Sequence, residues 1–435
     1  MVSNLSAAHE GCVAMKRAAP SDYAAQRLGL EQIAGIFRID ENNTVRQRRE
    51  GLAELEVDHH LTELGIQTIR SSLGGGSGGA AARSTSLACR VLAWACEGSE
   101  RDVADALVQK SAVAICFAVL QEFGMSDPSC ARSGLSLINS LCDRARSQLG
   151  REQLRRTPQA ADTLCRILRK WGEHAPTVEI ALSVAAWLGE RAISSLCAQV
   201  VRSGSTHPTD TAVVTAALSA CASMSFKSER NRVSLVKAGI LRFARACLEY
   251  RPAHQEVGCL VAQSVANVMQ SPEARIRFEF EGADHRRLTS LICSLVPRPN
   301  SFVADRAAAK LLRATTSAIT MISLSGTAVR EYIQVNCGVA LLLQDILDGH
   351  LPSIRVRMDT EFCLEIVNGK FGEADVSAFG AGTTMLRSRQ AATSGGRTGE
   401  DGGEGSGGSP GYLESHTGRK MQYLPRPKPT PQSVQ

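Results

Sequence analysis

The chain has 435 residues, a net charge of +6, 43% hydrophobic residues and only 4% aromatic residues. The hydrophobic fraction excludes a wholly disordered chain, and the scarcity of aromatic residues argues against a stacking platform for single-stranded nucleic acid. The charge excess is mild, so it permits an acidic partner without requiring one. A core of Ala, Leu, Val, Ile and Cys is typical of packed helices, and the length by itself suggests about three domains.

The N-terminal part contains three segments that call for separate interpretation. Residues 1–22 lack the apolar run of a secretory signal, and we expect them to be flexible. Residues 54–63 combine acidic residues with His59 and His60, whose side chains point about 100° apart on a helix. No second ligand pair follows, so we interpret this stretch as a solvated face and predict no metal or other cofactor. The Gly-rich run 71–82 lacks the ending of a phosphate-binding loop and is predicted to be a flexible insertion.

The fourteen cysteines occur singly, mostly among apolar residues, and none forms a Cys-x-x-Cys pair. This pattern predicts buried, reduced thiols that act as small hydrophobic side chains, as is usual in a reducing compartment. The longest apolar run, 112–120, is well short of the about 20 residues that cross a membrane. We therefore expect a cytoplasmic protein without a membrane partner, and the nucleus is the alternative location.

Between residues 23 and 376, apolar residues recur every three or four positions, which indicates amphipathic helices. Proline and glycine residues separate these segments. A shared pattern of small and aliphatic residues recurs about every 45 residues. Its aligned positions are Trp94, Asn139, Ala186, Ala220, Asn267, Ala314 and Asn368. A period of this length indicates one array of stacked helical repeats over 23–376 rather than three separate domains.

The apolar periodicity ends at about residue 377. Residues 394–411 are rich in Gly and Ser, and residues 423–432 carry a proline at alternate positions. Such segments bury too little apolar surface to offset the entropy lost on ordering. We therefore predict that 377–435 is a disordered tail.

The segment 228–270 is the clearest repeat, and it resembles an armadillo repeat. Asn231-Arg232 and apolar pairs precede a turn at Ala238-Gly239, and the last helix contains Asn267. Gly282 and Gly338 mark the same turn in two later units, where glycine permits a positive φ. HEAT repeats have a similar length and are the close alternative. The resemblance implies an all-α, right-handed α-solenoid of about six to seven armadillo-like repeats.

The resemblance also implies a groove for protein segments, because armadillo proteins use asparagines on their third helices to hydrogen-bond an extended peptide. The matching residues here are Asn139, Asn267 and Asn368. The tryptophans of the import-receptor branch are replaced by Leu135, Gln263 and Leu364, which argues against binding of basic nuclear signals. Hydrogen bonds at helix ends or between repeats are the alternative role of the asparagines. The groove that we predict comprises Asn139, Gln263, Asn267, Lys310, Arg313 and Asn368.

Residues 144–170 and 227–251 are rich in Lys and Arg. Stacked repeats would bring such residues into one stripe that attracts an acidic peptide or RNA, and a solvated outer face is the alternative. We define the basic patch as Arg151, Arg155, Arg156, Arg166, Arg169, Lys170, Arg242 and Arg245.

Several observations lead to a hypothesis about function. The sequence contains neither a nucleophile elbow in a strand–turn–helix context nor paired carboxylates in an apolar setting, so we predict that the protein is not an enzyme. The repeats favour an adaptor or scaffold that binds an extended or helical segment of a protein partner, acidic groups included. Two alternatives stay open: RNA binding through an Arg-rich face, and a cochaperone-like factor that holds a folded partner.

Overall fold

The computed structural model describes the helical part of the chain. The described residues are 2–19, 21–35, 54–56, 60–74, 78–98, 102–144, 148–280, 283–298, 306–349, 351 and 353–370. All regular secondary structure within them is helical, so the predicted all-α class is confirmed for this part. The described residues all fall in the first of two compact units, Met1–Ala381. The predicted tail, 377–435, lies outside them.

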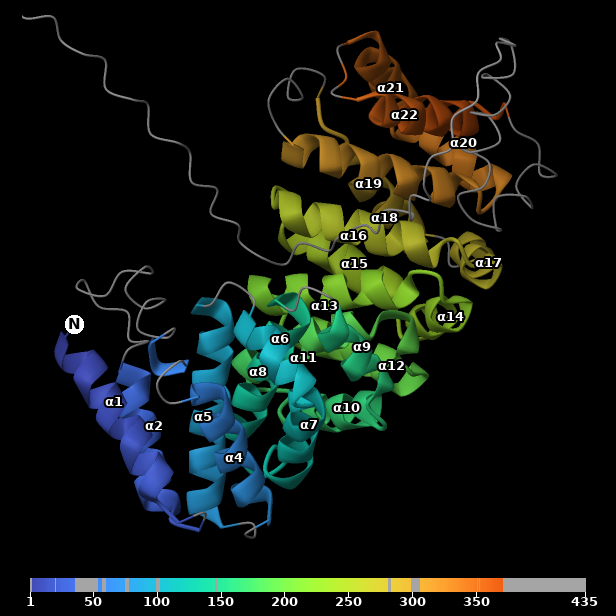
Figure 1. Cartoon of the computed structure of the whole chain (residues 1–435). Helices are drawn as coiled ribbons and strands as arrows, with labels where there is room; N and C mark the ends of the chain where they lie inside the picture. The colour runs from blue at the N-terminus through green and yellow to red at the C-terminus, as the bar shows by residue number, and fades with distance from the viewer. Residues whose placement is uncertain are drawn as a thin grey trace, which may run out of the picture. The chain divides into compact units, whose positions relative to one another are not determined.

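The centre of this unit is a row of helices in which each helix packs against the next (Figure 1). We call it the main row: α5 (Gly79–Gly98), α8 (Pro128–Arg144), α11 (Ala175–Leu188), α13 (Thr211–Ser225), α16 (Gln255–Val268), α19 (Arg306–Ser323) and α22 (Ile354–Val367). The aligned positions of the sequence repeat fall one to each helix, from Trp94 in α5 to Ala314 in α19, and Asn368 directly follows α22. The predicted period is therefore the spacing of the main row, and the predicted number of repeats is confirmed.

Shorter helices connect successive members of the main row. They are α6 (Asp102–Gln109) and α7 (Ala112–Glu122), α9 (Leu149–Arg156) and α10 (Ala160–Lys170), α12 (Ser194–Thr206), α14 (Glu229–Lys237) and α15 (Ile240–Tyr250), α17 (Pro272–Phe280) and α18 (Ala283–Ser294), and α20 (Thr327–Asn336) and α21 (Val339–Asp348). Between α11 and α13 the 3-10 turn η2 (Gly189–Arg191) replaces the first short helix. This replacement explains why the interval from Ala186 to Ala220 is shorter than the others.

A residue in the left-handed region separates the two short helices in four of the repeats. Gly239 has φ of 89° and Gly338 has φ of 60°, as the sequence pattern predicts, whereas Gly282 lies outside the described residues. Ser111 and Gln159 take the same conformation, with φ of 62° and 59°. The sharp turn between the helices requires this conformation, and residues with a Cβ adopt it at some energetic cost. The sequence pattern therefore missed the two turns that lack glycine.

The prediction of a flexible N-terminus over 1–22 is wrong for most of that segment. Helix α1 (Val2–Arg17) packs along α2 (Tyr23–Ala34). A Cβ atom added to Gly11 would lie 2.6 Å from the Gly29 carbonyl oxygen, so these two glycines allow the close approach. The side chains of Ala8, Cys12 and Met15 in α1 are buried. Their spacing of three and four places one apolar stripe against α2, which stabilises the helix.

The predicted flexible insertion over 71–82 is also wrong, at both of its ends. Helix α4 (Leu61–Gly74) extends to Gly74, and α5 begins at Gly79, so the two helices are four residues apart in the sequence, at 75–78. Ser72 and Ala81 are buried on either side of this break. Tertiary packing of such residues overrides the low helix propensity of the adjacent glycines.

The cysteines are part of the helical core. All fourteen are free, and all except Cys337 are buried, which confirms the prediction of small buried thiols. Burial raises the pKa of the Cys197 and Cys247 thiols to about 12, so both stay protonated near neutral pH. Separately, no described helix alone has the length and apolarity to span a membrane. The bent pair α6 and α7, which meet at 73°, passes that test only when the two are taken together.

Candidate protein-binding surface

The structure places the predicted groove residues on or directly after helices of the main row. Asn139 lies in α8, Gln263 and Asn267 in α16, Lys310 and Arg313 in α19, and Asn368 directly after α22. Helix α16 packs against α19, and α19 packs against α22, so the last five lie on consecutive helices of the row. Asn139 lies three helices earlier in the row than α16. The predicted groove is therefore a set of positions spread along the main row.

Two of the three predicted asparagines form hydrogen bonds between repeats. The Asn267 amide nitrogen, Nδ2, donates to the carbonyl oxygen of Ala222 in α13 at 2.9 Å. In α8, Asn139 accepts through Oδ1 from Trp187 Nε1 in α11, also at 2.9 Å. Each contact uses one polar end of the amide. The role in repeat packing, which the sequence left open as an alternative, is therefore present at both positions.

Trp187 is the centre of a cluster that the sequence pattern did not reveal. The Arg151 guanidinium lies over its ring, 4.2 Å from the ring centre, and Arg151 Nε donates to the Cys142 carbonyl oxygen at 2.9 Å. Arg155 Nε donates to the Trp187 carbonyl oxygen at 3.3 Å. Together with the bond to Asn139, these contacts join α8, α9 and α11. Two members of the predicted basic patch thus act in packing, and the presence of a rare Trp beside Ala186 was the only signal in the sequence.

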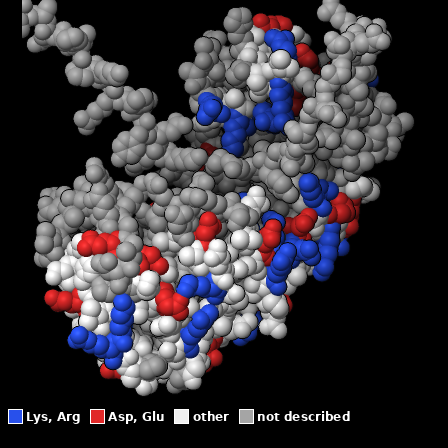
Figure 2. Space-filling view, viewed as in Figure 1, with Lys and Arg blue, Asp and Glu red and all other residues white. Residues whose placement is uncertain are grey.

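The remaining basic residues are spread over three short helices. They lie on the short helices α9, α10 and α15, and α12 packs between α10 and α15. Acidic residues contact two of them: Arg156 lies 3.7 Å from Glu152, and Arg245 lies 2.5 Å from Asp284. The others are Arg166, Arg169, Lys170 and Arg242, which are exposed. Figure 2 shows Lys and Arg interspersed with Asp and Glu over the described surface in view.

One face of the main row stays accessible. Each inner helix packs against a neighbour on both sides and against short helices, so its partly exposed side chains gather on the remaining face. These side chains recur mostly at intervals of three or four, and most are small or polar. We call them the main-row strip: Ser136, Asn139, Ser183, Ala186, Thr215, Ser223, Gln263, Asn267, Lys310 and Arg313. Arg313 also pairs with Asp359 of α22 at 3.1 Å.

Glu179, in helix α11 of the main row, has an ionised form that its surroundings disfavour. Desolvation raises the pKa of its carboxyl group above the ordinary 4.5, and the negative charge of Asp210 raises it further, whereas Arg132 lowers it. Asp210 caps α13, because its carboxylate accepts from the backbone N–H groups of Ala212 and Val213. Ionisation of Glu179 therefore works against folding, and this penalty appears as the pH rises through the raised pKa.

We expect Glu179→Gln to raise the melting temperature at pH 7. The substitution removes the ionised carboxylate that desolvation and Asp210 disfavour. Below the ordinary pKa of 4.5, Glu179 is protonated in the folded and unfolded states alike, so the difference from Gln should disappear. Thermal unfolding followed by circular dichroism at both pH values tests this. A lower melting temperature at pH 7 would mean that attraction to Arg132 dominates.

The opposite result is expected for Glu63→Gln, which serves as the control. Its hydrogen bond to Lys110 lowers the pKa of the Glu63 carboxyl group below the ordinary 4.5. The ionised carboxylate therefore stabilises the fold above pH 4.5, and this contribution is lost as the pH falls through the lowered pKa. Glu63→Gln should therefore lower the melting temperature at pH 7. The effect is small because the pair is accessible to solvent.

Comparisons with known proteins found similar structures but no similar sequence family. No family model matches the sequence, and none of the curated proteins does. An engineered protein solved by the Northeast Structural Genomics Consortium matches with a TM-score of 0.51 and 13% identity, over 82% of this chain and 88% of that one. UNC-45 from Drosophila melanogaster matches with a TM-score of 0.50 and 14% identity. This chain is covered to 85% in that match, and UNC-45 to 49%.

A third solved structure is a designed armadillo repeat protein in complex with the peptide (KR)4. It matches with a TM-score of 0.38 and 14% identity, over 70% of this chain and 99% of that one. At these identities the similarities concern the fold alone. The chain has an armadillo-like α-solenoid fold, as the resemblance in its repeats implies, and the two matches with TM-scores of 0.51 and 0.50 support this fold.

Proposed function

We propose that this protein is a non-enzymatic adaptor or scaffold that docks an extended or helical segment of a partner protein on the main-row strip. The carrying observation is the strip itself, in which small and polar side chains recur along consecutive stacked helices. A surface with this regular spacing suits a segment whose own peptide groups recur regularly. The fold supports the same role, because α-solenoids present extended binding surfaces.

The proposed mechanism assigns different tasks to the residues of the strip. Asn139 and Asn267 are each held by a bond to the neighbouring repeat, so their amides are oriented before a partner arrives. Lys310 is exposed near the start of α19 and would attract acidic groups of the partner. We do not favour RNA binding, because the arginines of the basic patch are spread over separate helices and two of them contact Trp187. The free cysteines are consistent with a cytoplasmic location, which is part of the proposal.

Site-specific cross-linking tests the proposal without disturbing the asparagines that hold the repeats together. A photo-reactive amino acid at Gln263 or Lys310 is expected to cross-link the full chain to a partner protein in cells, and mass spectrometry would locate the linked segment. The same group at Arg242, which is exposed on α15, is the control. A partner that cross-links from Arg242 and from neither strip position would contradict the assignment of the surface. Cross-links to RNA alone from these positions would contradict the partner class.

A further inference from the structure

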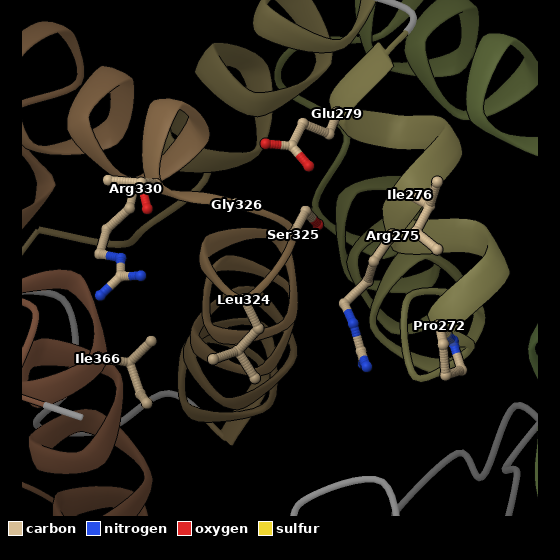
Figure 3. Close-up of a pocket in the computed structure, with 10 residues that line it drawn as sticks. Pro272, Arg275, Ile276, Glu279, Leu324, Ser325, Gly326, Arg330 and Ile366 are labelled. Atoms are coloured by element: carbon tan, nitrogen blue, oxygen red, sulfur yellow. The ribbon is translucent and has the colours of Figure 1, made fainter. Parts of the chain in front are cut away.

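A cavity of about 350 Å³ lies where α17, the end of α19 and the start of α20 meet (Figure 3). Polar residues that line it include Arg275, Glu279, Ser325 and Arg330. In Figure 3, Arg275 and Arg330 lie on either side of the segment that contains Ser325. None of the main-row strip residues lines this cavity, so its chemistry is separate from the proposed docking surface.

The start of α20 lacks a side-chain cap that two equivalent helices have. In α14, Ser228 precedes the helix and its hydroxyl accepts from the backbone N–H of Asn231 at 3.4 Å. In α17, Ser271 accepts in the same way from the N–H of Ala274 at 3.3 Å. Gly326 occupies the equivalent position before α20 and offers no side-chain acceptor. The start of α20, where Gly326 and Thr327 line this cavity, therefore lacks the acceptor that Ser228 and Ser271 supply to α14 and α17.

An arginine at the fourth position of each of these helices shows the same contrast. Arg232 of α14 donates through Nε to the Ser225 carbonyl oxygen at 3.0 Å. Arg275 of α17 donates through Nη1 to the Met269 carbonyl oxygen at 3.2 Å. The equivalent Nε of Arg330 in α20 is buried and finds no hydrogen-bond partner among the described residues. Arg232 and Arg275 thus use a side-chain donor to bond a carbonyl oxygen at the end of a main-row helix. Arg330 has a donor left available for a ligand.

Ser325 provides an independent observation in the same cavity. The residue is only 8% exposed, and its hydroxyl has no hydrogen-bond partner among the described residues. A buried polar group without a partner is costly to the fold. The hydroxyl of Ser325, the Nε–H of Arg330 and the N–H groups at the start of α20 are all donors. The ligand that satisfies them together is an acceptor with several oxygen atoms.

We propose that this cavity binds an oxyanion, and that its source is a phosphorylated serine or threonine side chain of a partner protein. The cavity lining contains the guanidinium groups of Arg275 and Arg330 and one carboxylate, that of Glu279. The lining therefore has an excess of one positive charge, which favours one compact anion. The apolar walls formed by Leu324 and Ile366 suit the stem of an amino-acid side chain. A nucleic-acid backbone would require a longer run of cations than this site has.

Calorimetric titration of the full chain in chloride buffer tests the proposal, with O-phospho-L-serine and serine as the first probes. We expect phosphoserine to bind with a millimolar Kd and serine not to bind. Arg330→Gln should weaken phosphoserine binding about tenfold, because a charge-assisted hydrogen bond is lost. Arg242→Gln, which removes an exposed charge elsewhere, should leave binding unchanged. Equal losses in both variants, or no binding to the wild type, would overturn the site.

Two further probes distinguish the sources of the anion. Inorganic phosphate that binds as tightly as phosphoserine would overturn the assignment to a phosphoprotein. An oligo-uridine RNA that displaces phosphoserine more effectively than phosphate does, in an Arg330-dependent manner, would also overturn it. Ser325→Ala is the milder variant if Arg330→Gln lowers helicity, and it should weaken binding several-fold without a change in the circular dichroism spectrum.

Two further variants of the cavity lining are expected to change the affinity for phosphoserine in opposite directions. Glu279→Gln should strengthen phosphoserine binding several-fold because it removes a like charge. Gly326→Ser should weaken binding several-fold because the new hydroxyl caps α20 in place of the ligand. The added Cβ would contact Glu279 Oε1, which is the end of an exposed side chain that can move away. Weaker binding in Glu279→Gln would identify Glu279 as a ligand and would overturn the proposal of an anion site.

Discussion

Trp187→Ala is expected to lower the free energy of unfolding by about 3 to 5 kcal/mol, which is the usual effect of truncating a buried aromatic residue. Trp187 is only 7% exposed. Its ring lies under Arg151, and its indole N–H is bonded to Asn139 of the preceding main-row helix. The substitution therefore removes apolar contacts and also leaves the side-chain oxygen of Asn139, Oδ1, without its donor. Urea unfolding followed by circular dichroism measures the change.

A more conservative variant separates the hydrogen bond from the packing. Trp187→Phe keeps an aromatic ring but removes the N–H, so it should cost about 1 kcal/mol from the lost bond in addition to a packing term. When Asn139 is already replaced by Ala, the part of the free-energy cost of Trp187→Phe that is due to the hydrogen bond should vanish. The double-mutant cycle then yields a coupling of about 1 kcal/mol between the two residues. Strictly additive effects would contradict the view that this bond stabilises the contact between α8 and α11.

Gly150→Ala is expected to destabilise the protein by about 1 to 3 kcal/mol through overpacking. Gly150 is buried at the start of α9, and an added Cβ would lie 2.9 Å from the backbone carbonyl carbon of Leu141 in α8. Backbone atoms of a packed helix yield less readily than the end of a side chain. The methyl group would therefore push α9 away from α8, and α9 carries the Arg151 that covers Trp187. Thermal unfolding measures the loss.

Gly79→Ala is the matched control for this substitution. Gly79 begins α5, and the nearest atom to an added Cβ there is Arg83 Nη1 at 3.8 Å. Alanine at this position should be neutral or stabilising by up to about 1 kcal/mol, because glycine has the higher conformational entropy in the unfolded chain. Equal melting temperatures for Gly150→Ala and the wild type would show that α9 does not pack against α8 as closely as described.

Much of the fold could be predicted from local patterns. The recurrence of apolar residues at three and four positions places the main-row helices, and the repeat of about 45 residues gives their spacing. Gly239 and Gly338 mark turns because glycine alone takes a positive φ at little cost. Ser111 and Gln159 make the same turn without glycine, so their positions could not be read from residue type. The helix at 2–17 was missed because its apolar stripe is short, and the packing of this stripe against α2 is what stabilises the helix.

The candidate surface was predicted in part. The positions of Asn139 and Asn267 on helices of the main row followed from the repeat, but their partners did not. Asn139 bonds to Trp187, which is 48 residues away, and Asn267 bonds to a carbonyl oxygen 45 residues away. The sequence could not show that α12 packs between two helices of the basic patch, because charge-rich segments contain no information on which helices lie between them.

The sequence by itself determined that this protein is an array of helical repeats, because side-chain periodicity and small residues act within a single helix or between adjacent repeats. Tertiary structure alone decided which amides hold neighbouring repeats together, which arginines contact Trp187, and that Arg330 and Ser325 keep buried donors without partners among the described residues. The physical reason is that hydrogen bonding depends on where backbone carbonyls of distant repeats come to lie. Those positions are set by the packing of whole helices and not by any short stretch of residues.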